Sequence, residues 1–463
     1  MSRPSNYILV KGGTVLTVDH TSGNLQNCDI LIKDDRIAAI GQDLPEPQDE
    51  AITVIDAHGC IAIPGFVDGH HHMWQQLLRG IATDWSLFDY TVNMRSIYGS
   101  LYTSEDVYLS TYIAALSLIN NGVTTVLEHC HIINSPDHSD AAVRALLDAG
   151  IRGTFCYGFY RNPPLPSSDG VAQEDEFSHS SRLGDAARIR KTYFGRNDPT
   201  DQLLTFGVAP DEPEAQSVEE TIAQIKQSRQ LGARIITMHV AMGPYDMARR
   251  RIVQQLADAE LLGTDLVLSH GASFTDGELD AIKNSGAAIV GTPDTELQMG
   301  MGFPIVFHAS DRGCRTCLGI DITSNQGNDF IAQMRLALQA RRAQENEAGL
   351  PLEIARKTSD VLRMGTMVGK KADIGPVRCD DIENIPVGDP VGSVVFHSSV
   401  KHIDTVIIDG KIKKKDGKLV TDWEHLKTEV VRRADRIKGE AAKVDLAAAR
   451  KTWLKIFDVD GTE

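Results

Sequence analysis

Residues 61–72 read IAIPGFVDGHHH, an apolar run that ends in three histidines. Similar short runs recur along the middle of the chain, namely TTVLEHC (124–130), GTFCYGF (153–159), TFGVAP (205–210), RIITMHV (234–240), DLVLSHG (265–271), AAIVGTP (287–293) and TCLGIDI (316–322). Segments with helical spacing separate most of them, for example residues 105–121, 214–231 and 245–262, and another, 329–345, follows the last run. Eight strands alternating with helices over roughly 300 residues predict an α/β fold, a (β/α)8 TIM barrel. An open doubly wound sheet also alternates, but no G-x-G-x-x-G follows an early strand.

Both ends of the chain show β-strand patterns. They cover residues 7–19, 28–32, 37–40 and 52–56 near the start, and 393–397, 403–408 and 411–415 near the end. Neither set has enough strands to cover a core alone, so we expect one small composite β-sandwich domain built from both termini. The predicted domains are residues 1–60, the N-terminal part of the sandwich; 61–363, the barrel; and 364–463, the rest of the sandwich with C-terminal helices from about residue 422. The polar insertion 161–202 is expected to be an active-site loop or lid.

Composition narrows the class of protein. Of 463 residues, 42% are hydrophobic and 24% charged, as in ordinary globular chains, and the formal net charge of −16 argues against nucleic acid and anionic membranes as partners. No apolar stretch of about 18 residues and no signal peptide is evident, so we expect a cytoplasmic protein. Seven scattered cysteines indicate reduced thiols rather than a disulfide framework. We expect a small-molecule substrate and a homo-oligomer.

The ends of four predicted strands carry metal-ligand residue types. Barrel enzymes place catalytic groups at the carboxyl ends of their strands. His70 and His72 end the first run and share a face, because alternate residues of a strand point the same way. His239 ends the fifth run and Asp321 the eighth. Three imidazoles and one carboxylate form a site suited to one divalent ion, Zn or alternatively Fe. His270 ends the sixth run, whereas other histidines, His131 among them, fit no such position.

These residues resemble a known family. The stretch Pro64–His72, then His239, Ser269-His270-Gly271, Gly291-Thr292-Pro293 and Gly319-Ile320-Asp321 look like the metal-dependent amidohydrolase superfamily. The match is closest to the branch with triazine hydrolases and cytosine or guanine deaminases, and Gly369–Asp373 and Asp404–Gly410 look like its late signatures. The resemblance implies a hydrolase in which His70, His72, His239 and Asp321 bind one metal ion and His270 contacts substrate. Binuclear members carry a carboxylated Lys on the fourth strand, and the fourth run here has none.

The resemblance also assigns the chemistry. Asp321 would accept the proton of a metal-activated water and pass it to a leaving nitrogen, and His270 would polarise the substrate. Deaminases of this branch usually carry a Glu three residues after the fifth-strand His, but this chain has Met242 there. A thioether cannot move a proton, so either another carboxylate, from Glu128, Glu296 or Asp211, replaces it, or the reaction is not an ordinary ring deamination. The candidate substrate-binding residues are Trp74, Gln75, Gln76, Glu128, Asp211, His270, Asp294 and Glu296.

The leading hypothesis is therefore a metal-dependent hydrolase that attacks a non-peptide C–N bond of a small cyclic or heteroaromatic compound. One alternative keeps the metal but makes the protein a lyase, cyclase or decarboxylase acting on a biosynthetic intermediate. The other is a barrel that has kept its fold without catalysis. The complete set of candidate ligands argues against the last alternative, because a scaffold does not need them.

Overall fold

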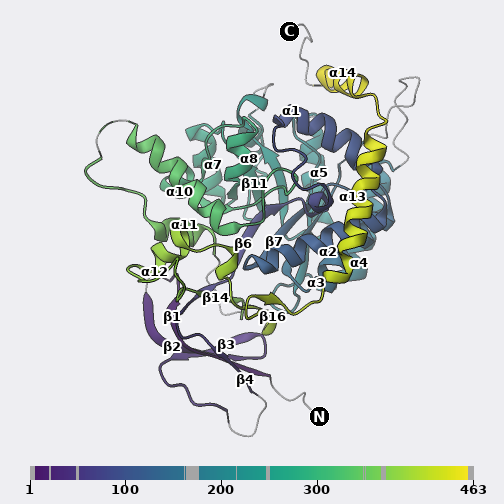
Figure 1. The fold of residues 1–463 in the computed structure, drawn as a ribbon. Coiled ribbons are helices and arrows are strands. Elements are labelled where there is room, and N and C mark those ends of the chain that lie inside the picture. The colour runs from purple at the N-terminus through teal and green to yellow at the C-terminus, as the bar shows by residue number, and fades with distance from the viewer. Residues whose placement is uncertain are drawn as a thin grey trace.

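Eight parallel strands form a barrel at the centre of the computed structural model (Figure 1). The model describes residues 6–19, 22–47, 52–160, 162, 177–214, 216–246, 251–347, 349, 351–366 and 372–456. The barrel strands pair in chain order, and they are β6 (Phe66–His71), β7 (Val123–Cys130), β8 (Arg152–Gly158), β9 (Leu204–Ala209), β10 (Ile236–Val240), β11 (Leu266–His270), β12 (Ala288–Gly291) and β13 (Arg315–Leu318). Each overlaps one of the eight predicted runs, so the barrel prediction is confirmed.

The barrel closes at the residues that were singled out as metal ligands. Asp321, three residues beyond β13, forms a parallel bridge with His71 of β6. Its N–H donates to the carbonyl of His70 at 2.8 Å, and its own carbonyl accepts from the N–H of His72 at 2.8 Å. The backbone hydrogen bonds that join the first and last strands therefore also hold Asp321 beside His70 and His72.

Helices surround the strands. They are α2 (Ser104–Asn120), α3 (Pro136–Ala149), α4 (His179–Tyr193), α5 (Val218–Gln230), α6 (Ile252–Asp258), α7 (Asp276–Ser285), α8 (Pro293–Gln298), α9 (Val306–Asp311), α10 (Phe330–Asn346) and α11 (Thr358–Met364), with the short turn η4 (Gly243–Tyr245) before α6. Local sequence signals fix several of their starts. Thr275 accepts a hydrogen bond from the N–H of Glu278, whose carboxylate accepts from the N–H of Thr275, and this capping box begins α7.

A long insertion follows β6, at the end of the barrel where the strands end. Residues after β6 form η1 (Met73–Leu78), α1 (Leu87–Tyr90), η2 (Thr91–Tyr98) and η3 (Gly99–Leu101). Of the expected lid at 161–202, residues 161 and 163–176 lie outside the described part of the chain. The loop prediction is wrong for 179–193, which form α4. Its buried face has helical spacing (182, 185, 186 and 189) but includes Arg182 and Asp185, so hydropathy did not reveal it.

The two ends of the chain share one nine-stranded sheet, at the bottom of Figure 1. Its strands are β1 (Tyr7–Leu16), β2 (Asn24–Lys33), β3 (Arg36–Gly41), β4 (Ile52–Asp56), β5 (Cys60–Pro64), β14 (Ile374–Arg378), β15 (Val406–Ile408), β16 (Lys411–Lys415) and β17 (Lys418–Leu419). The two ends meet where β5 pairs antiparallel with β14. Because β5 belongs to this sheet, the chain enters the barrel at Phe66 rather than at residue 61.

One predicted strand of this domain is wrong. Residues 393–397 are helical, as η5 (Ser393–His397), and follow α12 (Pro390–Gly392). Asp389 caps this segment by accepting hydrogen bonds from the N–H groups of Val391 and Gly392. Pro390 sits at the first helical position, where its ring is tolerated. The cap and the proline therefore outweigh the strand preference of the two valines that follow.

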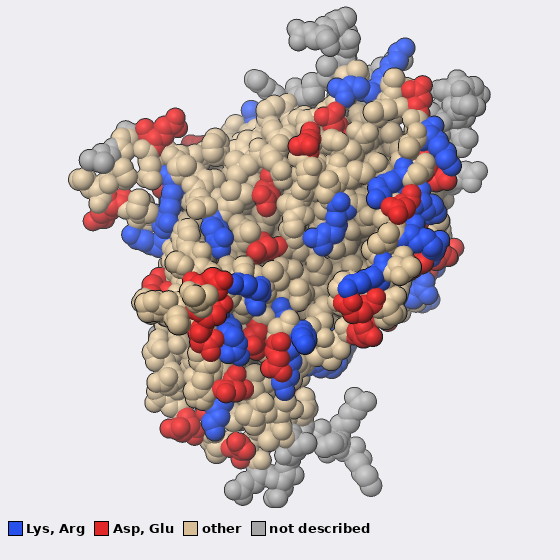
Figure 2. Space-filling view, viewed as in Figure 1, with Lys and Arg blue, Asp and Glu red and all other residues tan. Residues whose placement is uncertain are grey.

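The C-terminal segment continues as η6 (Val400–His402), η7 (Glu424–Leu426), α13 (Lys427–Ala441) and α14 (Leu446–Ile456), as the predicted helical tail requires. Figure 1 shows α13 running along one side of the barrel, with α14 beyond it. Figure 2 shows basic side chains along α13 with acidic ones among them, so this face has no surface of a single charge. Among the described residues, no helix combines the length and hydropathy that a transmembrane span requires.

Candidate active site

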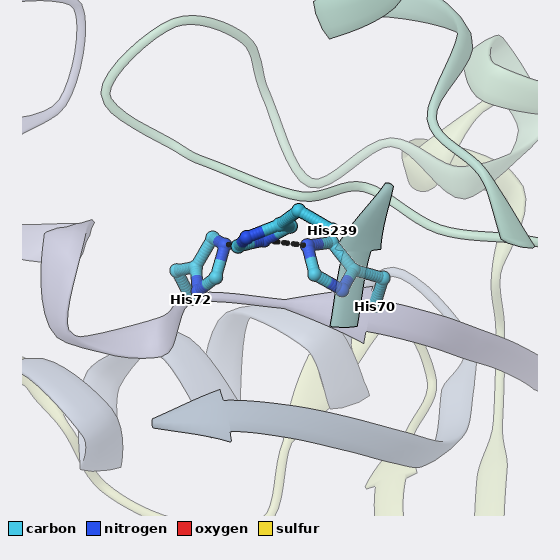
Figure 3. Close-up of side chains that lie close together, drawn as sticks. All are labelled: His70, His72 and His239. Atoms are coloured by element: carbon cyan, nitrogen blue, oxygen red, sulfur yellow. Dashed lines mark hydrogen bonds between the residues drawn. The ribbon is translucent and has the colours of Figure 1, made fainter. Parts of the chain in front are cut away.

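Three histidines converge at the carboxyl end of the barrel (Figure 3). The Nε2 atom of His239, from β10, lies 3.2 Å from Nε2 of His70 and 3.2 Å from Nε2 of His72. Asp321 completes the group, because its Oδ1 lies 3.4 Å from the Nε2 atoms of both His70 and His72. All four side chains are buried. The structure therefore brings together the four predicted ligands from three separate parts of the sequence.

The partners of the other ring nitrogens fix which nitrogen carries hydrogen. His72 Nδ1 donates to the backbone carbonyl of His129 at 2.8 Å, and His239 Nδ1 donates to Oε1 of Glu212 at 2.9 Å. Both partners are acceptors, so Nδ1 of each ring carries hydrogen, which in the neutral form of an imidazole leaves Nε2 bare to bind a metal ion. The third ring, His70, has Oγ of Ser269 at 2.8 Å from its Nδ1. Burial lowers the pKa of His70 to about 4 and that of His72 well below its usual value.

This arrangement fits a metal ion. Two bare nitrogens at 3.2 Å repel one another unless a cation lies between them. Ligands placed tetrahedrally at about 2.0–2.1 Å from zinc would be about 3.3–3.4 Å apart. His239 lies 3.2 Å from His70 and His72, and Asp321 lies 3.4 Å from both, so these four separations are close to that value. Three neutral imidazoles and one carboxylate are also a donor set that zinc and similar divalent ions prefer. The residues present therefore fit one metal ion.

His270 stands beside this group on the neighbouring strand β11. Its Nδ1 lies 3.1 Å from Oγ1 of Thr292 and 3.5 Å from Oε1 of Glu296. Burial opposes a charge on His270, but Glu296 and Asp321 outweigh it and raise the pKa of the imidazole. His270 and Asp321 both have left-handed backbone conformations, with φ of 76° and 73°. Such strain in residues other than glycine is concentrated at functional sites.

The chain is similar to known proteins along most of its length. A model of the amidohydrolase family matches residues 61–413. The chain belongs to the amidohydrolase family. Its sequence is similar to a 5-methylthioadenosine/S-adenosylhomocysteine deaminase of Pyrococcus horikoshii, 25% identical over 435 residues, covering 89% of this chain and 96% of that protein. It is equally similar to a 5'-deoxyadenosine deaminase of Methanosarcina barkeri, 25% identical over 435 residues, covering 89% and 94%.

Solved structures share the fold of this amidohydrolase. An adenosine deaminase from Xanthomonas campestris with bound zinc has a TM-score of 0.78 at 19% identity, over 94% of this chain and all of that one. A triazine hydrolase variant has a TM-score of 0.75 at 21% identity, over 93% and 99%. The predicted family, fold and enzyme class, a hydrolase of C–N bonds other than peptide bonds, are thus confirmed.

The candidate substrate residues after β6 are all buried in η1 of this amidohydrolase. Trp74 donates its indole N–H to Nδ1 of His131 at 2.9 Å. Gln75 donates to the hydroxyl of Tyr90 at 2.6 Å, and its Oε1 accepts from Ser324 Oγ at 2.6 Å. Gln76 is also buried, and its Oε1 has no partner among the described residues. Protein hydrogen bonds thus occupy Trp74 and Gln75, whereas Gln76 keeps a free acceptor.

The carboxylates at the ends of the other strands differ in their surroundings. Glu128 points away from the metal ligands, because His129 beside it faces them; its Oε2 accepts from the N–H of Met73 at 3.0 Å, and burial raises its pKa well above the usual range. Asp294 accepts from Gln333 at 2.6 Å, and Asp211 from the N–H of Glu212 at 2.9 Å. Of these candidates, Glu296 is the one that contacts His270.

Sequence reasoning missed several side chains around the ligands. His129, at the end of β7, stacks on His239 with ring centroids 4.4 Å apart, and its Nε2 lies 3.0 Å from the hydroxyl of Tyr160. His131, for which no role was expected, stacks on His72 with centroids 3.9 Å apart. Glu212 contacts His239. The signal for His129 was available, because TTVLEHC ends in polar residues as the other runs do. Glu212 had none beyond its place one residue after Asp211.

Proposed function

We propose that this amidohydrolase removes an amino group, or another leaving group, by hydrolysis from the ring of a small heteroaromatic compound, with aminopurine nucleosides as the first class to test. One divalent ion, zinc in the first instance, would be held by His70, His72, His239 and Asp321. The observation that carries the proposal is the meeting of bare imidazole nitrogens, 3.2 Å apart, beside a buried carboxylate. The relatives named above are deaminases of adenosine derivatives, which supports the substrate class.

The bound ion would supply a water molecule whose pKa is lowered from 15.7 to about 7, so that a nucleophile is available at neutral pH. The chain's own residues would do the rest. Asp321 directs Oδ1 at His70 and His72, so its other oxygen, Oδ2, would be the one to accept a proton from the metal-activated water. His270, oriented by Thr292 and Glu296, would donate a hydrogen bond to the ring atom that becomes negative in the transition state.

The position of Met242 bears on the second proton, which the departing amine needs. Met242 follows Ala241, whose φ is 51°, and precedes the turn η4. The Glu that deaminases of this branch usually carry at this position is absent. Asp321 must therefore return its proton to the leaving nitrogen, or a second group must donate one. The proposal therefore covers leaving groups other than ammonia.

A substrate panel tests the proposal. Purified protein supplied with Zn²⁺ would be mixed with adenosine, 5'-deoxyadenosine, 5'-methylthioadenosine, guanine, cytosine and amino- or chlorotriazines. Ammonia release and product mass would be measured, with the His239→Ala variant as the control. We expect at least one substrate to exchange its ring substituent for oxygen, and the variant to be inactive. A folded, metal-loaded protein that converts no member of the panel would contradict the proposed substrate class.

A further inference from the structure

Glu212 is the only charged partner among the groups that hold the Nδ1 atoms of the three described histidine ligands. His72 Nδ1 contacts a backbone carbonyl, and His70 Nδ1 contacts the hydroxyl of Ser269. His239 Nδ1 instead contacts Oε1 of Glu212 at 2.9 Å. A carboxylate on the far nitrogen orients a metal-binding imidazole, fixes its tautomer and makes it a stronger ligand. Glu212 therefore influences the metal site through His239 without touching the ion.

The competing partner of His239 is weaker. The hydroxyl of Tyr160 lies 3.3 Å from His239 Nδ1, farther than the Glu212 carboxylate, and it also lies 3.0 Å from Nε2 of His129. A neutral hydroxyl accepts a hydrogen bond less strongly than a carboxylate does. If Glu212 lost its charge, Tyr160 could keep the ring of His239 near its place but could not make the nitrogen equally basic.

Arg95 contacts the same carboxylate oxygen of Glu212 that His239 contacts. Its Nη1 lies 3.6 Å from Oε1 of Glu212, and its guanidinium lies over the ring of Tyr160, 4.7 Å from the centroid. Its Nε and Nη2 donate to Oδ1 of Asn162 at 3.4 and 3.3 Å. Arg95 is buried in η2, part of the insertion that follows β6 and His72. The insertion and a metal ligand on the opposite strand β10 are thus joined through one ion pair.

We infer that Glu212 is a positioning residue for the metal site, acting through His239 and kept in place by Arg95. The inference rests on the proposed metal site. Glu212 and Arg95 both lie outside the barrel strands, Glu212 just after β9 and Arg95 in the insertion. The strength of the metal site would therefore depend on parts of the chain that contribute no metal ligand.

The test is metal affinity in the Glu212→Gln variant. Gln keeps the size of the side chain but removes its charge. We expect binding of Zn²⁺, measured by competition with a chromophoric chelator, to weaken about 10- to 100-fold. The visible absorption of the Co²⁺-loaded variant should also change, because His239 is a weaker ligand. The matched control is Glu219→Gln on the exposed first turn of α5, which should leave both quantities unchanged.

Arg95→Gln completes the test. Because Arg95 acts through Glu212, adding Arg95→Gln to Glu212→Gln should weaken Zn²⁺ binding little further, although Arg95→Gln alone weakens it. Circular dichroism of the metal-free variants checks that they fold, and Glu212→Asp provides a second variant that keeps the charge and should bind more tightly than Gln. Zn²⁺ affinity of Glu212→Gln within about twofold of the wild type, with an unchanged Co²⁺ spectrum, would overturn the inference. A wild-type protein that binds no metal would contradict the metal site itself.

Discussion

In the proposed mechanism, the chemistry depends most on Asp321. It faces two ligand histidines and is held in a strained left-handed conformation by the hydrogen bonds that close the barrel. We expect Asp321→Asn to lower kcat by at least about 10²–10⁴, because the amide cannot accept a proton, while substrate binding changes less than about tenfold. Steady-state rates and equilibrium binding check this, with metal content measured alongside. Near-normal turnover would show that another group takes the proton.

Glu296 and Glu128 make a second comparison at the residue scale. Both are buried, but Glu296 lies 3.5 Å from Nδ1 of His270, whereas Glu128 accepts from the backbone N–H of Met73. We expect Glu296→Gln to lower kcat about 10²-fold or more, as loss of a placed carboxylate does. Glu128→Gln should leave kcat within a few-fold. If both variants were equally active and no substrate released ammonia, the reaction would not be a ring deamination. Met242 in place of the usual Glu would then reflect a different reaction.

The residue pattern predicted which of the proposed metal ligands lie together, but it did not predict the side chains around them. His70, His72, His239 and Asp321 could be predicted because strand ends of a barrel meet at one place, so position along each run was enough. Arg95 and Tyr160 could not be predicted in this way. Arg95 lies in an insertion, and Tyr160 follows the end of β8, where no periodicity relates them to the strands. Such positions depend on tertiary packing alone.

At the scale of elements, hydropathy patterns gave wrong predictions for two segments. One buries polar side chains, and the other begins with a helix-capping residue. The helix α4 buries Arg182 and Asp185, and the latter accepts from the hydroxyl of Tyr157 at 2.9 Å. Buried polar side chains of this kind give a helix the polar composition of a solvent-exposed loop, so the sequence alone predicts a loop. Residues 393–397 show the reverse, since their apolar β-branched side chains suggest a strand although Asp389 and Pro390 begin a helical segment before them.

Strand β16 places a lysine at the contact with a barrel helix. Lys414 is 2% exposed and donates to the carbonyl of Asn120, the last residue of α2, at 2.8 Å. Burial lowers the pKa of Lys414 to about 8, although Asp404 acts in the opposite direction. In the unfolded chain a lysine side chain has a pKa of about 10.4, so it keeps its proton up to about that pH. Between these values the unfolded state binds more protons, so stability contributed by this residue rises with pH.

This rise in stability with pH should be absent from the Lys414→Met variant. The melting temperature of the wild type relative to the variant should increase from pH 8 to pH 10. Over this pH range the free energy of unfolding of the wild type should rise, relative to the variant, by on the order of 2–3 kcal/mol, since one pKa unit corresponds to about 1.4 kcal/mol. Lys415→Met, on the same strand but exposed, is the control and should follow the wild type. A constant difference between wild type and Lys414→Met across this range would show that Lys414 is not deprotonated in the folded protein.

At the scale of the whole molecule, the composite sheet and the barrel depend on one another. The chain leaves β5 of the sheet at Pro64 and enters β6 at Phe66. This strand holds His70, and His72 follows its end; both are proposed metal ligands. The helices α13 and α14 return along the barrel, and Arg450 of α14 pairs with Asp89 at 2.9 Å in the insertion after β6. Both ends of the chain thus support the segment that holds His70, His72 and Arg95.

The metal-to-chain ratio of the purified protein tests the central claim most directly. Elemental analysis should find about one divalent ion per chain, because His70, His72 and His239 form one group of possible ligands, and Asp321 lies 3.4 Å from two of them. In the same measurement, His239→Ala should retain almost none while remaining folded, since this ligand lies at a strand end rather than in the apolar core. A protein without metal, or with two ions at full occupancy, would contradict the account.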